Sequence, residues 1–277
     1  MIKEGIKVII DKETLKERMF FSTGVTKVKG LGKTYNQVFH VNSYVPKEPW
    51  IGLSQEMQSI LISKNLSNLD YTEAISIIQI PHEISALFEK LNLNKVENYE
   101  FLDELKQQKA NEYFDAMFAL DNYIYKYLIK DDKFDKLGVH IGKSNLFSST
   151  ISGSKYVGLH IDNWDNLTFD NIDNATNRIS INLGNEDRFL IFINLTIKQM
   201  YKELKKYTNK SLVQYDNNSI VHDFFKFFPN YPILRIKQKP YEAYIAPTEH
   251  IIHDGSTLGS HSTDVTLTTR GYFKLYL

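Results

Sequence analysis

The sequence predicts an α+β protein with a mainly β core, a jelly-roll or cupin-like double-stranded β-helix that carries a helical N-terminal portion and a helical insertion. Three observations predict this class. Residues 1–135 show mainly helical patterns, residues 136–277 hold short β-like segments with turn-rich connections, and residues 196–228 interrupt these segments with a helical pattern. We expect a single domain over residues 1–277, with the helical portion packed on the outside of the β core.

The helical portion is indicated by the spacing of its apolar residues. Between Glu97 and Lys130 they recur at steps of three, four or eight residues, which predicts one long amphipathic helix. Shorter helices are expected over Ser54–Asn65 and His82–Leu91. Residues 24–45 contain several glycines and β-branched residues, which indicate a hairpin or irregular strands.

Strand-like segments follow one another from about residue 136 onward. They are Leu137–Ile141, Lys155–Asp162, Arg178–Leu183, Arg188–Ile193, Ile233–Ile236, Tyr241–Ala246, His250–His253 and Asp264–Leu277. Short strands with turn-rich connections favour a double-sheet jelly roll over a parallel α/β fold. The dipeptide Asp254-Gly255 is expected to form the turn that ends the segment at His253.

The composition excludes several classes of protein. Lysine and arginine number 33 and aspartate and glutamate number 33, so the charge gives no reason to expect nucleic acid or an anionic membrane as a partner. The absence of cysteine rules out disulfides, thiolate nucleophiles and cysteine-ligated metals. No apolar run approaches the roughly 20 residues that span a bilayer, and no signal-peptide core is visible. We expect a cytoplasmic protein with a small-molecule partner.

The residues that indicate chemistry are His160 and Asp162, in the stretch Val-Gly-Leu-His-Ile-Asp-Asn-Trp. Residues two apart on a strand project from the same face, so this imidazole and this carboxylate can bind one metal ion. About one such His-x-Asp/Glu triplet is expected by chance, so the context has to support the site. That context is a segment ending in His-Ile-Ile-His-Asp-Gly, with His253 before the expected turn, and a last strand that carries Arg270.

This arrangement resembles the iron(II)- and 2-oxoglutarate-dependent oxygenase superfamily over residues 137–277. The resemblance implies that His160, Asp162 and His253 bind iron(II) as a two-histidine, one-carboxylate triad. It also implies a dioxygenase that uses O₂ and 2-oxoglutarate to hydroxylate an unactivated carbon, with succinate and CO₂ as co-products. Because Asp162 is present where related halogenases have a small residue, hydroxylation is expected, and desaturation or cyclisation is possible on the same scaffold.

The resemblance also implies a cation for the far carboxylate of 2-oxoglutarate. We expect Arg270 in this role, with the hydroxyls of Thr266 and Thr268 on the same strand face. The sequence departs from the family pattern, because the gap from His253 to Arg270 is long and the position where many members have the arginine is near Asp264. Two further arginines on expected core strands are therefore alternative anchors: Arg178 and Arg188.

Other histidines and a polar loop leave alternatives open. His261 is the rival of His253 as the distal ligand, and His250 should face away from the metal on a straight strand. The remaining histidines are expected at surface or packing positions: His40, His82, His140 and His222. Trp164 either lines the substrate pocket or anchors its loop. Residues 163–177 form a lid, a solvated loop or a calcium loop, the last of which would use Asp165, Asp170 and Asp173.

The sequence does not identify the substrate. By analogy with the family we expect a free amino acid, a peptide or a natural-product intermediate. Two other functions stay open: a non-catalytic jelly-roll protein that binds a small ligand or sugar, and a metal-dependent hydrolase or isomerase on the same fold. The oligomeric state is also left open.

Overall fold

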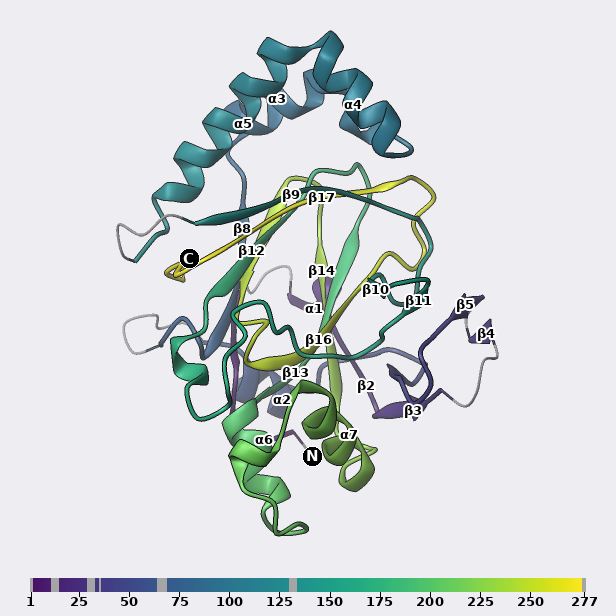
Figure 1. The fold of residues 1–277 in the computed structure, drawn as a ribbon, viewed down its shortest axis with the longest axis vertical. Coiled ribbons are helices and arrows are strands. Elements are labelled where there is room, and N and C mark those ends of the chain that lie inside the picture. The colour runs from purple at the N-terminus through teal and green to yellow at the C-terminus, as the bar shows by residue number, and fades with distance from the viewer. Residues whose placement is uncertain are drawn as a thin grey trace.

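The computed structural model describes residues 2–10, 15–28, 33–34, 36–63, 69–129 and 134–275. The chain forms a mixed α/β structure in which two larger, mostly antiparallel sheets lie face to face. Helices cover the outer face of each sheet, so four layers follow one another from top to bottom in Figure 1. Among the described residues, none of the helices is long and apolar enough to cross a bilayer.

The first sheet has six strands. Their order is β1 (Lys7–Ile9), β8 (Ala74–Gln79), β15 (Glu242–Ala246), β12 (Asn177–Asn182), β17 (Asp264–Gly271) and β9 (Asp135–Gly142). All neighbours are antiparallel except β1 and β8, which are parallel. The register places Arg178 on β12 directly opposite Arg270 on β17. These two expected anchor candidates therefore lie side by side on one face of the sheet.

The second sheet has five strands, and smaller pairs lie beside it. Its order is β16 (Ile251–Ser256), β13 (Arg188–Thr196), β14 (Ile233–Gln238), β2 (Met19–Ser22) and β7 (Ile51–Gly52). The antiparallel pairs are β3 (Val25–Lys27) with β6 (Tyr44–Pro46), β4 (Lys33–Thr34) with β5 (Gln37–Val38), and β10 (Ile151–Ser152) with β11 (Lys155–Tyr156). The expected irregular strands at 24–45 are thus present, although residues 29–32 and 35 lie outside the described part of the chain.

Each sheet has two differently filled faces because successive side chains of a strand alternate. On β17, Val265 and Leu267 pack outward in the core under the first helical layer, whereas Thr266, Thr268 and Arg270 project the other way, toward the second sheet. The expectation that these three polar residues share one strand face is therefore confirmed.

The first helical layer consists of α3 (His82–Leu91), the short η1 (Leu93–Lys95), α4 (Tyr99–Gln108) and α5 (Ala110–Tyr125). The expected single helix from 97 to 130 is wrong. The backbone leaves the helical region at Lys109 (φ −125°, ψ 45°), and α4 and α5 meet at an angle over the sheet (Figure 1). The eight-residue step of the apolar pattern falls at this break, which lets both helices direct apolar residues into one core.

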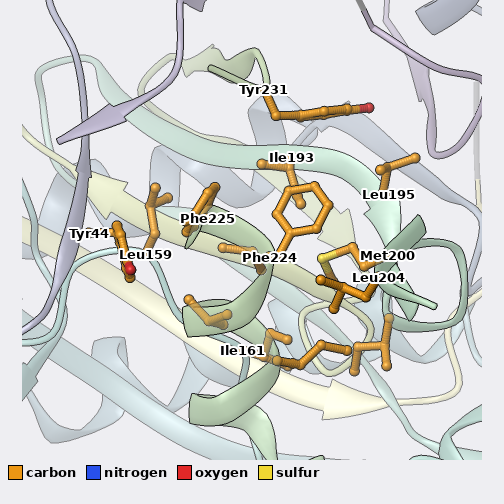
Figure 2. Packing of buried hydrophobic residues seen from close by; sticks show 14 of the residues in the cluster. Tyr44, Leu159, Ile161, Ile193, Leu195, Met200, Leu204, Phe224, Phe225 and Tyr231 are labelled. Atoms are coloured by element: carbon orange, nitrogen blue, oxygen red, sulfur yellow. The ribbon is translucent and has the colours of Figure 1, made fainter. Parts of the chain in front are cut away.

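The second helical layer is the expected insertion between two core strands, and this prediction is confirmed. It contains α6 (Ile197–Leu204), η3 (Leu212–Gln214) and α7 (Asn217–Phe227), which connect β13 to β14. Thr196 and Asp216 cap the N-termini of α6 and α7 through reciprocal capping boxes. Figure 2 shows Phe224 and Met200 packed against Ile193 on the outer face of the second sheet.

The N-terminal portion is not mainly helical, which corrects the expectation for residues 1–135. Its residues up to Gln79 supply β1, β2, β7 and β8 to the two large sheets, and the helices among them, α1 (Leu15–Arg18) and α2 (Gln55–Leu61), are short. The physical reason is the buried, β-branched run of β8, in which Ile75 is fully buried between the sheets. A strand with both faces covered shows a continuous apolar run, which lacks the alternation that identifies a half-exposed strand.

Two other expectations need correction. Asp254-Gly255 is not a turn, because β16 continues to Ser256 and stays paired with β13 through Gly255. The expected strand over 155–162 is reduced to β11 and an isolated bridge at His160, because Gly158 has φ +76° and interrupts it. The last strand ends at Gly271, and residues 276–277 of its expected range lie outside the described residues.

Candidate metal centre

His160 and His253 lie on neighbouring extended segments. The backbone N–H of His160 donates to the carbonyl of His253 at 3.0 Å, and the reverse bond measures 2.8 Å. This two-way pairing places the imidazoles side by side, with ring centroids 4.6 Å apart. Asp162 projects to the same side, and its N–H donates to Thr248 O at 3.2 Å. The fold thus brings His253 to a pair of residues that lie more than ninety positions before it in the sequence.

Both imidazoles are oriented by backbone carbonyls. The Nδ1 atom of His160 donates to Gly158 O at 2.8 Å, and that of His253 donates to Ile251 O at 3.3 Å. Each Nε2 atom therefore presents a lone pair toward Asp162, at 3.6 Å from a carboxylate oxygen. Hydrogen bonds from the far nitrogen are how proteins fix the tautomer of metal-binding histidines.

The separations suit a metal ion. The three candidate ligand atoms all lie within 4.8 Å of one another. Distances of 3.6 Å are too long for hydrogen bonds. Ligands about 2.1 Å from a shared ion lie roughly 3 Å from each other, a spacing close to the 3.6 Å between each Nε2 atom and the carboxylate. Two imidazoles and one carboxylate are the donor set of the facial triad.

Two of the three candidate ligands are deprotonated at neutral pH, as metal binding requires, whereas the neighbouring Asp162 raises the pKa of the third, His160, despite its burial. Burial opposes ionisation of Asp162, but Arg178, with Nη2 2.6 Å from Oδ2, outweighs it, so the pKa of this carboxyl is held well below its usual range. Burial lowers the pKa of His253 to about 3, so its imidazole is neutral. Metal ligands must be deprotonated, and these two groups already are.

The surroundings hold the ligand segment in place. At Gly158 a Cβ atom would lie 2.5 Å from Tyr44 O, so only glycine permits this close approach at a positive φ. On the other side, the side-chain amide of Asn217 donates to Asp162 O at 2.5 Å and to Ile161 O at 3.2 Å. The start of α7 is thereby tied to the backbone of the aspartate.

Arg270 lies near the triad but is already paired with carboxylates. Its Nη1 donates to Asp165 at 2.9 Å, its Nη2 is 3.4 Å from Asp135, and its guanidinium lies 5.5 Å from the centre of the Trp164 ring. The exposed Trp164 also donates its backbone N–H to Glu249 at 2.8 Å. These contacts favour the interpretation of Trp164 as an anchor of its loop.

The other two arginines also face carboxylates. Arg178 pairs with Asp162, as described above. Arg188 is buried, and its Nε lies 3.6 Å from Asp264 Oδ1. A Cβ atom on Gly255, two residues beyond His253, would lie 3.2 Å from the Nη2 of Arg188. Arg188 therefore reaches the interior next to the strand that carries the distal histidine.

The remaining expected site residues are placed as follows. Thr266 is buried opposite Asn182, and Thr268 donates to Ser180 Oγ at 3.4 Å. His261 is exposed and lies outside the triad, so the structure places His253, and not its rival, beside His160 and Asp162. His250 also stays outside it.

Of the alternatives for residues 163–177, the calcium loop does not form among the described residues. Asp165 is occupied by Arg270 and by the backbone N–H and hydroxyl of Thr176. The exposed Asp173 pairs with Lys198 on α6 instead. Among the residues that the structure describes, the triad is the group of histidine and acidic side chains close enough together to bind one metal ion.

Sequence reasoning missed Glu249, Asn217 and Gly158. Glu249 is buried beside the triad, and burial, with the neighbouring Asp162 and Asp165, raises its pKa to about 7. Its position four residues before His253 is the only sequence signal that could have identified it. Nothing in the sequence linked Asn217, some 55 residues downstream, to the aspartate.

A cavity of about 630 Å³ adjoins the triad on the side of His160. Its wall comes from residues 40–44, residues 157–160 and the start of α7. Asp162 and His253 are buried and do not line it, whereas His160 does. The site thus has a buried side, where the arginines are found, and an accessible side, where this cavity lies.

Comparison with known proteins finds a distant structural likeness. Solved structures of the Kdo hydroxylase KdoO, a non-haem Fe(II) α-ketoglutarate-dependent dioxygenase, are similar to this chain in complex with succinate and Fe(III) and in complex with cobalt(II). Each is 11% identical, covers 79% of this chain and 85% of its own, and has a TM-score of 0.37. No protein-family model matches the sequence, and no curated protein matches it. A likeness at this level does not define an activity, which has to be inferred from the residues of this chain.

Proposed function

We propose that this chain is a non-haem iron(II)- and 2-oxoglutarate-dependent oxygenase that hydroxylates an unactivated carbon of a small substrate. The observation that carries the proposal is the convergence of two oriented imidazole Nε2 atoms and one ionised carboxylate. Such a triad leaves coordination positions open and is typical of non-haem iron(II) oxygenases.

The path of the chain supports a double-stranded β-helix as the scaffold. From β12 to β17 the chain passes repeatedly between the two large sheets, with β12, β15 and β17 in the first and β13, β14 and β16 in the second. The triad then lies at one end of the space between the sheets, where both walls supply side chains.

Arg188 is our proposed anchor for the far carboxylate of 2-oxoglutarate. The family resemblance places this cation near Asp264, and the guanidinium of Arg188 is the one that lies beside that residue. Arg270, expected from the sequence, lies 2.9 Å from Asp165 and 3.4 Å from Asp135. Arg188 lies farther from its carboxylate, at 3.6 Å from Asp264, so it is the less tightly engaged of the two arginines. Arg178 is engaged by Asp162 and is better suited to holding that carboxylate in position.

The residues of this chain would bind and orient. His160, Asp162 and His253 would hold the iron, with both imidazoles fixed by their Nδ1 hydrogen bonds. Arg178 keeps Asp162 ionised and directs its oxygens. When bound, iron(II) with 2-oxoglutarate and O₂ supplies the oxidising chemistry that couples decarboxylation of 2-oxoglutarate to hydroxylation of the substrate.

The test is anaerobic titration of the metal-free protein with iron(II) and then 2-oxoglutarate, while the visible absorption is recorded. We expect a weak charge-transfer band that requires both additions. It should be absent in His160→Ala and unchanged in His261→Ala, a matched control in which the exposed histidine is replaced. A folded wild-type protein without this band would contradict the proposal.

The anchor is tested in the same titration. Arg188→Met should raise the concentration of 2-oxoglutarate needed for half of the band by at least about tenfold, because a buried charge-assisted pair is lost. Arg270→Met should change it much less. The reverse order of effects would return the role to Arg270. Release of succinate that requires O₂ would further separate an oxygenase from a hydrolase or isomerase.

A further inference from the structure

The cavity beside His160 is firmly connected to the metal-binding segment. The N–H of Leu159 donates to Tyr44 O at 2.9 Å, and the N–H of His40 donates to Tyr156 O at 3.0 Å. Next to the lining residues Asp216 and Asn218, Asn217 donates to Asp162 O. A ligand in this cavity would therefore be held at a fixed position relative to the triad.

The wall offers many neutral hydrogen-bonding groups. Asn42, Ser43, Ser152, Asn218 and Ser219 line it, with imidazoles from His40 and His222. Side chains of Val157, Leu159 and Val221 contribute apolar surface. A volume of about 630 Å³ lies within the usual range of small-molecule pockets.

The charge of the wall is unfavourable for an anion. Among the described residues that line the cavity, none is lysine or arginine. Its one carboxylate, Asp216, caps α7, and the backbone N–H of Ser219 holds the pKa of this carboxyl below its usual value, so it stays ionised at neutral pH. Lys27 packs over the ring of Tyr44, 5.9 Å from its centre, and does not line the cavity.

We propose that this cavity binds the substrate of the oxygenase, and that the substrate is a neutral, polyhydroxylated small molecule of the carbohydrate class. This inference rests on the proposed function. The charged and the neutral binding groups lie in different places. The cations Arg178, Arg188 and Arg270 do not line the cavity and lie on the buried side of the triad, where an anionic co-substrate would need them. The cavity itself provides amides, hydroxyls and imidazoles, which pair with hydroxyl groups and leave a carboxylate or phosphate without a lysine or arginine partner.

The test is calorimetric titration of the anaerobic protein, loaded with iron(II) and 2-oxoglutarate, at pH 7.5. The neutral probes are methyl glucoside, N-acetylglucosamine, maltose and sorbitol. The matched charged probes are glucose 6-phosphate and glucuronate, which keep the ring but add an anion. We expect saturable binding of at least one neutral probe and at least tenfold weaker binding of the charged ones.

Two variants localise the binding. Asn218→Ala and Asn42→Gly each remove an amide from the wall, and glycine retains the left-handed backbone of Asn42 (φ 69°). Each should weaken binding of the neutral probe roughly five- to tenfold. The controls are Asn122→Ala, exposed on α5, and Asn92→Gly, which has φ 55° at the end of α3. Both lie in the other helical layer and should leave the affinity unchanged.

The outcomes distinguish this inference from the proposed function. If the charge-transfer band forms but only charged probes bind, or no neutral probe binds, the substrate class is wrong and the oxygenase stands. If a neutral probe binds and Asn218→Ala weakens it while no band forms in any condition, the ligand class is supported and the oxygenase is wrong. Equal loss of affinity in the control variants would overturn the assignment of the cavity.

Discussion

The space between the two large sheets has two halves with opposite contents. In one half, Leu190, Phe192, Leu234 and Ile236 form a fully buried apolar cluster. In the other half lie His160, Asp162, Arg178, His253, Arg188 and Asp264. The two halves touch at neighbouring strands, because Phe192 on β13 is the register partner of His253 on β16.

The difference shows how a buried polar site is tolerated. The apolar half holds the sheets together by burial, which stabilises without requiring any directional partner. The polar half is desolvated as well, and there each charge needs an opposite charge: Asp162 has Arg178, and Arg188 has Asp264. Substitutions in the apolar half should therefore lower the stability of the whole fold. In the polar half, the loss of stability should depend on whether a substitution leaves a buried charge without its opposite charge.

The largest effect is expected from Phe192→Ala. Phe192 is fully buried in the apolar half, so loss of its ring should lower the free energy of unfolding by about 3–5 kcal/mol. Urea denaturation of the metal-free protein measures this. Phe114→Ala is the control, because that ring is 66% exposed on α5 and should change stability by less than about 0.5 kcal/mol. Similar values for both variants would refute the idea that the apolar half holds the sheets together.

The next effect concerns the Asp162–Arg178 pair. Arg178→Met leaves a buried carboxylate without its cation and should cost about 3 kcal/mol at pH 7. The double variant Arg178→Met/Asp162→Asn removes both charges, so it should recover most of that loss. A double-mutant cycle by urea denaturation measures the coupling. Additive single effects would show that the charges do not depend on each other.

A smaller effect should appear as pH dependence. The pKa of His253 is about 3, below the ordinary value of about 6.5, so between these values the unfolded chain binds a proton that the native one does not. Stability from this group is therefore lost as the pH falls from about 6.5 toward 3, with a slope of up to about 1.4 kcal/mol per pH unit. Glu249 and Asp254 act in the opposite direction, because burial raises their pKa values to about 7 and about 6.

The contribution of His253 is isolated by a difference measurement. In the presence of a chelator, His253→Leu should gain stability relative to wild type as the pH is lowered from 6.5 to 4.5. The same series on His261→Leu, at an exposed position, should show no such gain. A constant difference between wild type and His253→Leu across this range would contradict the assigned direction of the pKa shift.

The smallest effect is expected where α7, in the second helical layer, contacts the backbone of the metal-binding segment. Asn217→Ala removes the hydrogen bonds to Asp162 O and Ile161 O, and should cost about 1 kcal/mol. Because it releases the backbone of a ligand, it should also weaken iron(II) binding by roughly fivefold. Asn218→Ala, on the same helix but without these bonds, should not affect iron(II) binding. Equal metal affinities in all three proteins would show that Asn217 is not needed to position Asp162.

Part of the site could be predicted because its signals are local. His160 and Asp162 are two residues apart, and alternation along an extended segment suffices to place them on one side. The shared face of Thr266, Thr268 and Arg270 follows from the same rule. The prediction failed where a neighbouring strand decided the outcome, as at Gly255, which stays paired with Leu190 instead of forming a turn.

The sequence by itself determined the positions of most core strands, the helical insertion and the chemical types of the site residues, because side-chain periodicity and turn preferences act over a few neighbouring residues. Only the tertiary structure decided that β1, β2 and β8 join the sheets, that Arg188 lies beside Asp264 while Arg270 meets Asp165, and that Tyr44 lies against Gly158. These are contacts between segments far apart in the chain. They depend on which strands become neighbours, and that is set by burial and hydrogen bonding of the whole molecule and not by any local pattern.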